Sequence, residues 1–215
     1  MEDTDFIIKD SPQIQTVARL DDLFARPFGP ALNACVHRRS LTQDFNALAR
    51  HLAEGMEQDI YVRHLDYDDL SALRVQLPGD AERHALDSII KDADALLDLH
   101  QPGFARFSCR LVRANPAEPE NRSGAERFHA DGEAGDPYFE NVLCTYAGQP
   151  TEYLAAPGKI GDFGLCNIWR FACRNSEAVA KPLIHRAPRV MAQEEPRLVL
   201  ILTRSNRALW PAYDF

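Results

Sequence analysis

The residue pattern changes character near Gly103, and this change limits the folds that are open to the chain. Before Gly103, apolar residues recur at the helical spacing, as they do at Leu86, Ile89 and Ala93. After Gly103, short segments alternate apolar and polar residues and are separated by turns rich in glycine and proline. A helical part followed by many short strands is typical of α+β proteins and predicts a β-sandwich or jelly roll whose helices cover one sheet face.

The expected elements follow from these two periods. We expect helices over 17–24, 42–56 and 80–99, with Ser40 or Thr42 capping the second and Asp80 capping the third. Strands are expected over 60–65, 104–112, 142–146, 152–154, 162–171 and 197–203. Residues 1–103 would then form a mainly helical part packed on a core of residues 104–215, all within one structural domain.

Composition excludes several classes of protein. With 215 residues, 45% of them hydrophobic, the chain can bury a sizeable core, and its net charge of −8 argues against a dedicated nucleic-acid or anionic-membrane binder. The acidic start lacks the pattern of a signal peptide, and no apolar run reaches the length of a membrane span. Five cysteines without a Cys-x-x-Cys pair suit reduced thiols. We therefore expect a soluble, cytoplasmic protein.

The strongest chemical signal is a His-x-Asp pair with a distant second histidine. His129 and Asp131 lie two residues apart, so both side chains can leave a strand on the same side, and His185 lies in a late apolar segment. Two imidazoles and one carboxylate suit Fe(II), Mn(II) or Zn(II), and three ligands on one face of a cation leave its other face open. The three residues are therefore candidate metal ligands and catalytic residues.

A second signal is an arginine at the start of a strongly apolar strand. Arg197 precedes the run Leu198–Leu202, and a buried guanidinium needs an anionic partner. The distal carboxylate of a bound 2-oxo acid would serve, held by two hydrogen bonds. The alternative is a surface ion pair between Arg197 and Glu194 or Glu195.

This order of residues resembles the Fe(II)- and 2-oxoglutarate-dependent dioxygenases, over roughly 104–203. The resemblance implies a double-stranded β-helix with iron on His129, Asp131 and His185, and 2-oxoglutarate on Arg197. Arg186 is a competitor of Arg197 for the cosubstrate.

A more specific resemblance is to DUF1826, an uncharacterised bacterial family with no established activity. It rests on four segments that are similar to that family's signature: 127–131, 144–152, 185–188 and 197–200.

Four further residues are weaker candidates. The Tyr146 hydroxyl could donate to a bound carboxylate, or its ring could simply belong to the core. Thr151 and Glu152 could contact substrate, although Glu152 also suits a solvated strand position. Asn167 sits in an apolar run, where its amide must find partners.

Three hypotheses therefore stand. The first is an Fe(II)/2-oxoglutarate oxygenase that acts on a small molecule or a protein side chain. The second is a zinc hydrolase on the same three ligands, with Glu152 or Glu133 as general base. The third is a non-catalytic, cupin-like module that binds a metal or a small molecule.

Overall fold

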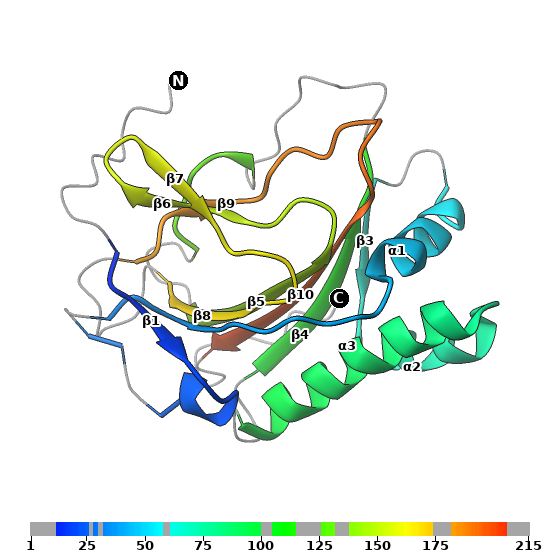
Figure 1. Ribbon diagram of the computed structural model, residues 1–215, viewed down its shortest axis with the longest axis horizontal. Coiled ribbons are helices and arrows are strands. Elements are labelled where there is room, and N and C mark those ends of the chain that lie inside the picture. The colour runs from blue at the N-terminus through cyan, green and yellow to red at the C-terminus, as the bar shows by residue number, and fades with distance from the viewer. Residues whose placement is uncertain are drawn as a thin grey trace.

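Two β-sheets of unequal size form the centre of the computed structural model, which describes residues 12–25, 28–29, 32–57, 61–99, 105–114, 126–131, 138–173 and 182–205. The larger sheet has seven strands in the order β1-β2-β8-β5-β10-β4-β3, and the smaller has three in the order β7-β6-β9. All neighbouring strands are antiparallel except the parallel pair β1 and β2. The fold is an α+β double-stranded β-helix, as expected from the sequence (Figure 1).

The strands come from both halves of the chain. The first half provides β1 (Ile14–Val17), β2 (Ala34–His37) and β3 (Val62–Leu65). The second half provides the remaining strands: β4 (Ala105–Val112), β5 (Tyr138–Ala147), β6 (Glu152–Ala156), β7 (Lys159–Asp162), β8 (Ile168–Ala172), β9 (His185–Arg186) and β10 (Arg197–Ser205). Early strands therefore lie in one sheet with late ones, and the division of the chain at residue 103 stays a prediction.

Three helices lie on the outer side of the larger sheet (Figure 1). They are α1 (Phe45–Glu54), α2 (Tyr67–Gln76) and α3 (Asp80–Leu99). Asp44 caps α1 by accepting a hydrogen bond from the Ala47 amide, so the expected caps Ser40 and Thr42 are wrong. None of the helices in the described residues is long and apolar enough to cross a membrane.

One expected helix is absent from the described part of the N-terminal region. Over 17–24 the structure has the end of β1 and a single 3-10 turn, Asp21–Leu23. The backbone amides of Leu23 and Phe24 donate to Leu20 and Asp21 at the three-residue spacing. The turn buries Leu23 completely. This single turn accounts for an apolar residue at a helical spacing, although no helix forms.

The larger sheet separates two hydrophobic cores. One lies under the helices and contains alternate residues of β5 and β10, such as Val142, Cys144, Leu198 and Leu200. The other lies on the opposite face, where Leu143 and Val199 meet three buried aromatic residues, Phe163, Trp169 and Phe171. Because side chains alternate along a strand, Val142 and Cys144 of β5 face the first core and Leu143 between them faces the second.

Candidate metal centre

His129, Asp131 and His185 meet on the inner side of the fold. His129 and His185 exchange both backbone hydrogen bonds, each with an N···O distance of 2.9 Å, so the main chain holds these distant residues side by side. The Nε2 atom of His129 lies 3.3 Å from Asp131 Oδ1, and that of His185 lies 3.3 Å from Asp131 Oδ2. Candidate ligand atoms of all three residues lie within 4.8 Å of one another, as a shared cation requires.

Both imidazole rings are oriented by backbone carbonyls. His129 Nδ1 lies 2.6 Å from the Arg127 carbonyl oxygen, and His185 Nδ1 lies 3.2 Å from that of Leu183. A carbonyl can only accept, so each Nδ1 carries the proton, and in the neutral ring Nε2 presents a lone pair. Two lone pairs and a carboxylate then face a common point. Such a set of acceptors fits a divalent cation, and outer hydrogen bonds of this kind usually fix metal-bound histidines.

The electrostatics of Asp131 favour its ionised form. Burial alone would raise the pKa of its carboxyl group. In the metal-free protein, with a proton on Nε2 as well, the imidazoles of His185 and His129 donate to Asp131, outweigh the effect of burial and hold this pKa well below its usual range. A carboxylate that stays ionised at neutral pH is the form that binds metal.

Aromatic packing supports the buried histidine. His185 is 5% exposed, and its ring makes an edge contact with Phe171 at a centroid distance of 4.8 Å. Phe163 stacks on Trp169 at 4.3 Å in the same cluster. These rings leave His185 little room to rotate away from Asp131.

The residue that sequence reasoning missed is Asn141. It lies on β5, is 6% exposed, and its Nδ2 donates a short hydrogen bond to Asp131 Oδ2. The other polar residue on this face of β5 is Thr145, four residues later. The available signal was a pair of polar residues four positions apart in an apolar strand, because such residues face the same side of the sheet.

Arg197 is buried on the same face of the larger sheet, at the start of β10. Its Nε donates to the Gln149 carbonyl oxygen at 2.9 Å, and its Nη2 lies 2.6 Å from Thr151 Oγ1 and 3.5 Å from Thr145 Oγ1. Among the described residues it makes no salt bridge with a carboxylate. Burial, with a smaller contribution from the charge of Arg110, lowers the pKa of Arg197 to about 10.

The expected alternative for Arg197, a surface ion pair, is wrong. Glu194 accepts from Gln149 at 2.6 Å and Glu195 pairs with Arg50 at 2.8 Å, while Arg197 is only 6% exposed. Gly148, at φ +73°, allows the intervening turn to approach Arg197, because a Cβ there would lie 2.9 Å from the Arg197 Cα.

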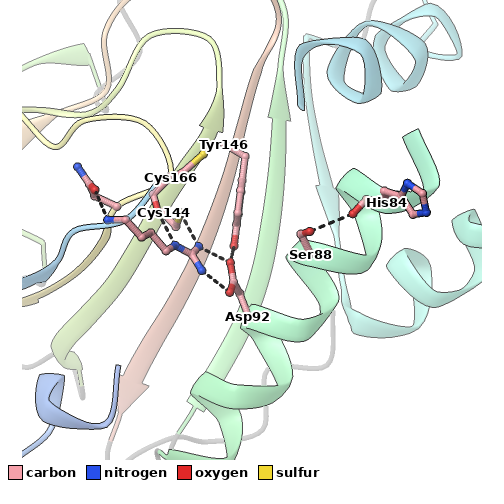
Figure 2. Close-up of polar contacts among 8 residues, drawn as sticks. His84, Ser88, Asp92, Cys144, Tyr146 and Cys166 are labelled. Carbon is pink, nitrogen blue, oxygen red and sulfur yellow. Dashed lines mark hydrogen bonds and ion pairs between the residues drawn. The ribbon is translucent and has the colours of Figure 1, made fainter. Parts of the chain in front are cut away.

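Tyr146 is not at the site. Its side chain points to the helix-covered core, where its hydroxyl donates to Asp92 of α3 at 2.5 Å and Asp92 pairs with Arg39 (Figure 2). Tyr146 and Thr145 are consecutive on β5, so they face opposite sides of the sheet. The proposed contact between Tyr146 and a cosubstrate carboxylate is therefore corrected: Tyr146 is a core residue.

Arg186 and Glu152 also lie away from the metal ligands. They pair with each other across β9 and β6 at 2.6 Å, and the Arg186 guanidinium lies 4.3 Å from the centre of the Phe128 ring. His185 and Arg186 are consecutive, so Arg186 leaves β9 on the outer face. Both expected roles, Arg186 for a cosubstrate and Glu152 for substrate, are therefore unsupported.

The last two candidates, Asn167 and Thr151, lie in different surroundings. The Asn167 side chain accepts from the Arg39 amide at 3.1 Å and donates to the Phe163 carbonyl at 3.0 Å, so it fixes a loop and has no contact with the candidate ligands. Thr151 is 1% exposed and stays with Arg197. Glu133 lies outside the described residues.

Comparison with known proteins gives structural similarities only. No family model matches the chain, so the resemblance to DUF1826 is not confirmed, and no curated protein matches it. Among solved structures, a Trichoplax adhaerens prolyl hydroxylase in complex with a peptide fragment is 9% identical, with a TM-score of 0.46 over 82% of this chain and 85% of that one. A putative oxygenase from Shewanella oneidensis is 12% identical, with a TM-score of 0.44 over 90% of this chain and 89% of that one.

A third similar structure was solved with a ligand. The viral collagen prolyl hydroxylase from Paramecium bursaria Chlorella virus-1, in its 2OG complex, is 14% identical, with a TM-score of 0.32 over 71% of this chain and 100% of that one. With TM-scores this low, the class is best defined by the protein's own features: a double-stranded β-helix that carries a His-Asp-His cluster on its inner side.

Proposed function

We propose that this protein is an Fe(II)- and 2-oxoglutarate-dependent oxygenase. The observation that carries the proposal is the combination of two features on one face of the sheet. His129, Asp131 and His185 present only acceptors to a common point, and Arg197 is a buried cation without a carboxylate partner among the described residues. The cluster of acceptors suits a cation and the buried guanidinium suits an anion. A metal ion with a bound dicarboxylate would provide both.

The spacing of the two features suits such a ligand. Asn141 touches Asp131 and Thr145 touches Arg197, and these two residues of β5 are four apart. At about 3.4 Å per residue their Cα atoms are about 14 Å apart. Side chains reaching inward from both ends shorten this gap to a length that a five-carbon diacid can span.

Each residue then has a defined role. The two Nε2 atoms and the Asp131 carboxylate would hold iron, and Arg197, with Thr151, would orient the distal carboxylate of 2-oxoglutarate. Iron and the cosubstrate would supply the redox chemistry. The aromatic cluster around Phe163 and Trp169 keeps water from the back of the site.

The other hypotheses receive less support. The zinc hydrolase would need a general base, and Glu152 is engaged by Arg186 on the outer face. A non-catalytic metal-binding module has the same ligands and is separated from the oxygenase by turnover. The substrate we propose is a small molecule or a protein side chain. All five cysteines are buried and none of them forms a disulfide within the described residues. A cytoplasmic location stays a prediction.

The test is anaerobic loading with Fe(II), addition of 2-oxoglutarate, and then exposure to oxygen. We expect a visible absorption band from the iron chelate of the 2-oxo acid, followed by succinate formation. His185→Ala should abolish both, and Arg197→Met should weaken 2-oxoglutarate binding. Arg186→Met is the matched control, because this arginine lies on the outer face and should be dispensable.

Two outcomes would overturn the proposal. The first is that iron-loaded protein with 2-oxoglutarate shows no visible absorption band and forms no succinate. The second is a requirement for Arg186 in place of Arg197. Stoichiometric zinc with hydrolytic turnover would favour the second hypothesis, and metal binding without any turnover would favour the third.

A further inference from the structure

Asn141 has no assigned role in the proposed function, yet its side-chain amide donates a hydrogen bond to a candidate metal ligand, Asp131. It lies in the middle of the larger sheet, opposite Phe171 of β8 on one side and Thr203 of β10 on the other. Phe171 in turn packs against His185. The backbone of Asn141 is therefore fixed by two neighbouring strands, and the residue is buried between elements that carry the site.

The hydrogen bond to Asp131 determines how the amide is oriented. A carboxylate oxygen can only accept, so the Nδ2 group of Asn141 must face Asp131 Oδ2. The amide oxygen then points elsewhere, and among the described residues Asn141 Oδ1 is buried without a hydrogen-bond partner. Buried polar atoms are nearly always paired, so an orphan acceptor beside a metal-ligand set indicates a donor that belongs to the working site.

The two carboxylate oxygens of Asp131 are not equivalent. Among the described residues, the one polar partner of Oδ1 is His129 Nε2, whereas Oδ2 faces His185 Nε2 and also accepts from Asn141. A carboxylate whose second oxygen is engaged by an amide binds a cation through the first oxygen. Chelation through both oxygens would use one more position on the cation and would have to break the bond to Asn141.

We infer that Asn141 is a positioning residue that holds Asp131 as a one-oxygen ligand and so keeps a third coordination position open. Its unpartnered Oδ1 accepts a hydrogen bond from a water or from a hydroxyl or amine group of a molecule at that open face. The inference rests on the metal-binding half of the proposed function, and it holds whether the chemistry is oxygenation or hydrolysis.

The test uses Co(II), whose visible absorption reports coordination number without redox chemistry. The variant is Asn141→Leu, which has the same number and branching of non-hydrogen side-chain atoms and removes both the donor and the orphan acceptor. The control is Thr203→Val, which changes a hydroxyl on the directly opposed residue of β10 that has no contact with Asp131. Oxalate, a two-oxygen chelator, probes whether adjacent positions on the metal are open.

We expect Asn141→Leu to bind Co(II) about 10- to 100-fold more weakly than the native protein, the usual cost of losing an outer-shell partner. Its Co(II) spectrum should differ from that of the native protein, and oxalate should perturb it less. Thr203→Val should match the native protein in all three respects. A purely structural role would lower the metal-free melting temperature but leave the affinity of the folded protein, the spectrum and the oxalate response unchanged.

The outcomes separate the two levels of the argument. If the native protein fails to bind Co(II), the metal centre itself is wrong and this inference falls with it. If the native protein binds Co(II) and Asn141→Leu matches it in affinity, spectrum and oxalate response, the metal centre stands and the role of Asn141 is refuted. Asn141→Ala offers a second test should the leucine variant fold poorly, because it adds no bulk and cannot donate to Asp131.

Discussion

The buried arginine at the start of β10 leads to the sharpest prediction. Arg197 and Arg170 are both almost fully buried, at 6% and 4% exposure. They differ in their partners among the described residues: Arg170 forms a buried salt bridge with Glu140, at 2.5 Å, whereas the Arg197 guanidinium donates to neutral oxygens alone. Replacing each with methionine therefore compares a guanidinium that is paired with a carboxylate with one that has no described carboxylate partner.

The expected energies follow from these surroundings. A pKa lowered to about 10 from 12.5 corresponds to about 3 kcal/mol against the charged form in the folded state. This penalty applies fully at all pH values below about 10 and is relieved only as the pH rises through that value. Arg197→Met removes the penalty but leaves the Gln149 carbonyl unpaired, at about 1–3 kcal/mol. The two effects nearly cancel, so the ligand-free stability should change by less than about 2 kcal/mol.

Arg170→Met should behave differently. It removes the guanidinium from the buried salt bridge with Glu140, and breaking a buried ion pair typically costs about 3–5 kcal/mol. Stabilisation by 2-oxoglutarate should show the reverse order: Arg170→Met should keep it and Arg197→Met should lose it. A ligand at a hundred times its Kd stabilises a protein by about 2.7 kcal/mol, which corresponds to roughly 5–10 °C in Tm for a chain of this size.

The assay is thermal and urea unfolding, with and without 2-oxoglutarate, in the presence of Mn(II). Native protein and Arg170→Met should both gain stability from the diacid, and Arg197→Met should not. The reasoning is refuted if Arg197→Met destabilises the free protein as much as Arg170→Met does. It is also refuted if Arg197→Met keeps the full stabilisation by 2-oxoglutarate.

Three further outcomes are expected. Asp92→Ala should destabilise the protein by about 3–5 kcal/mol in urea unfolding, because it leaves Arg39 buried without its carboxylate; an unchanged midpoint would contradict this. Burial raises the pKa of Cys109 and of Cys144 to about 12, so both thiols should resist alkylation at pH 8 until the protein unfolds, as peptide mapping would show. The lowered pKa of Asp131 contributes stability above about pH 4 that is lost as the pH falls further, so metal-free Asp131→Asn should lose less stability than native protein between pH 5 and pH 3.

The sequence predicted the elements whose periodicity is strong. Helix α3 covers the expected range, although Asp80 is its first helical residue and the prediction that Asp80 caps it is wrong. Strands β4, β6 and β10 fall within a few residues of their expected ranges. The helix α2 was missed because it buries only Leu70 and so has no apolar stripe, although the capping pair Asp66 and Asp69 marks its start. Strand β2 was missed because four residues are too few for a clear alternation.

The residue types in the sequence identified candidates for the site, but they did not show which side of the sheet each side chain faces. The order His129, Asp131, His185 and Arg197 was enough to nominate a metal centre and a buried cation, and the structure brings the first three together. Tyr146 was placed on the wrong face because its register on β5 depends on pairing with β8 and β10, which no local pattern reveals. The same register puts Asn141, outside the expected strand, next to Asp131.

The reciprocal backbone pairing of His129 and His185 has a consequence for how this protein would acquire its cation. Main-chain bonds set the distance between the two rings without any contribution from a cation, so we expect the ligands to come together as the protein folds. The occupant would then be decided by which metals the surroundings supply as well as by the ligands. Purification conditions would accordingly determine which metal is found.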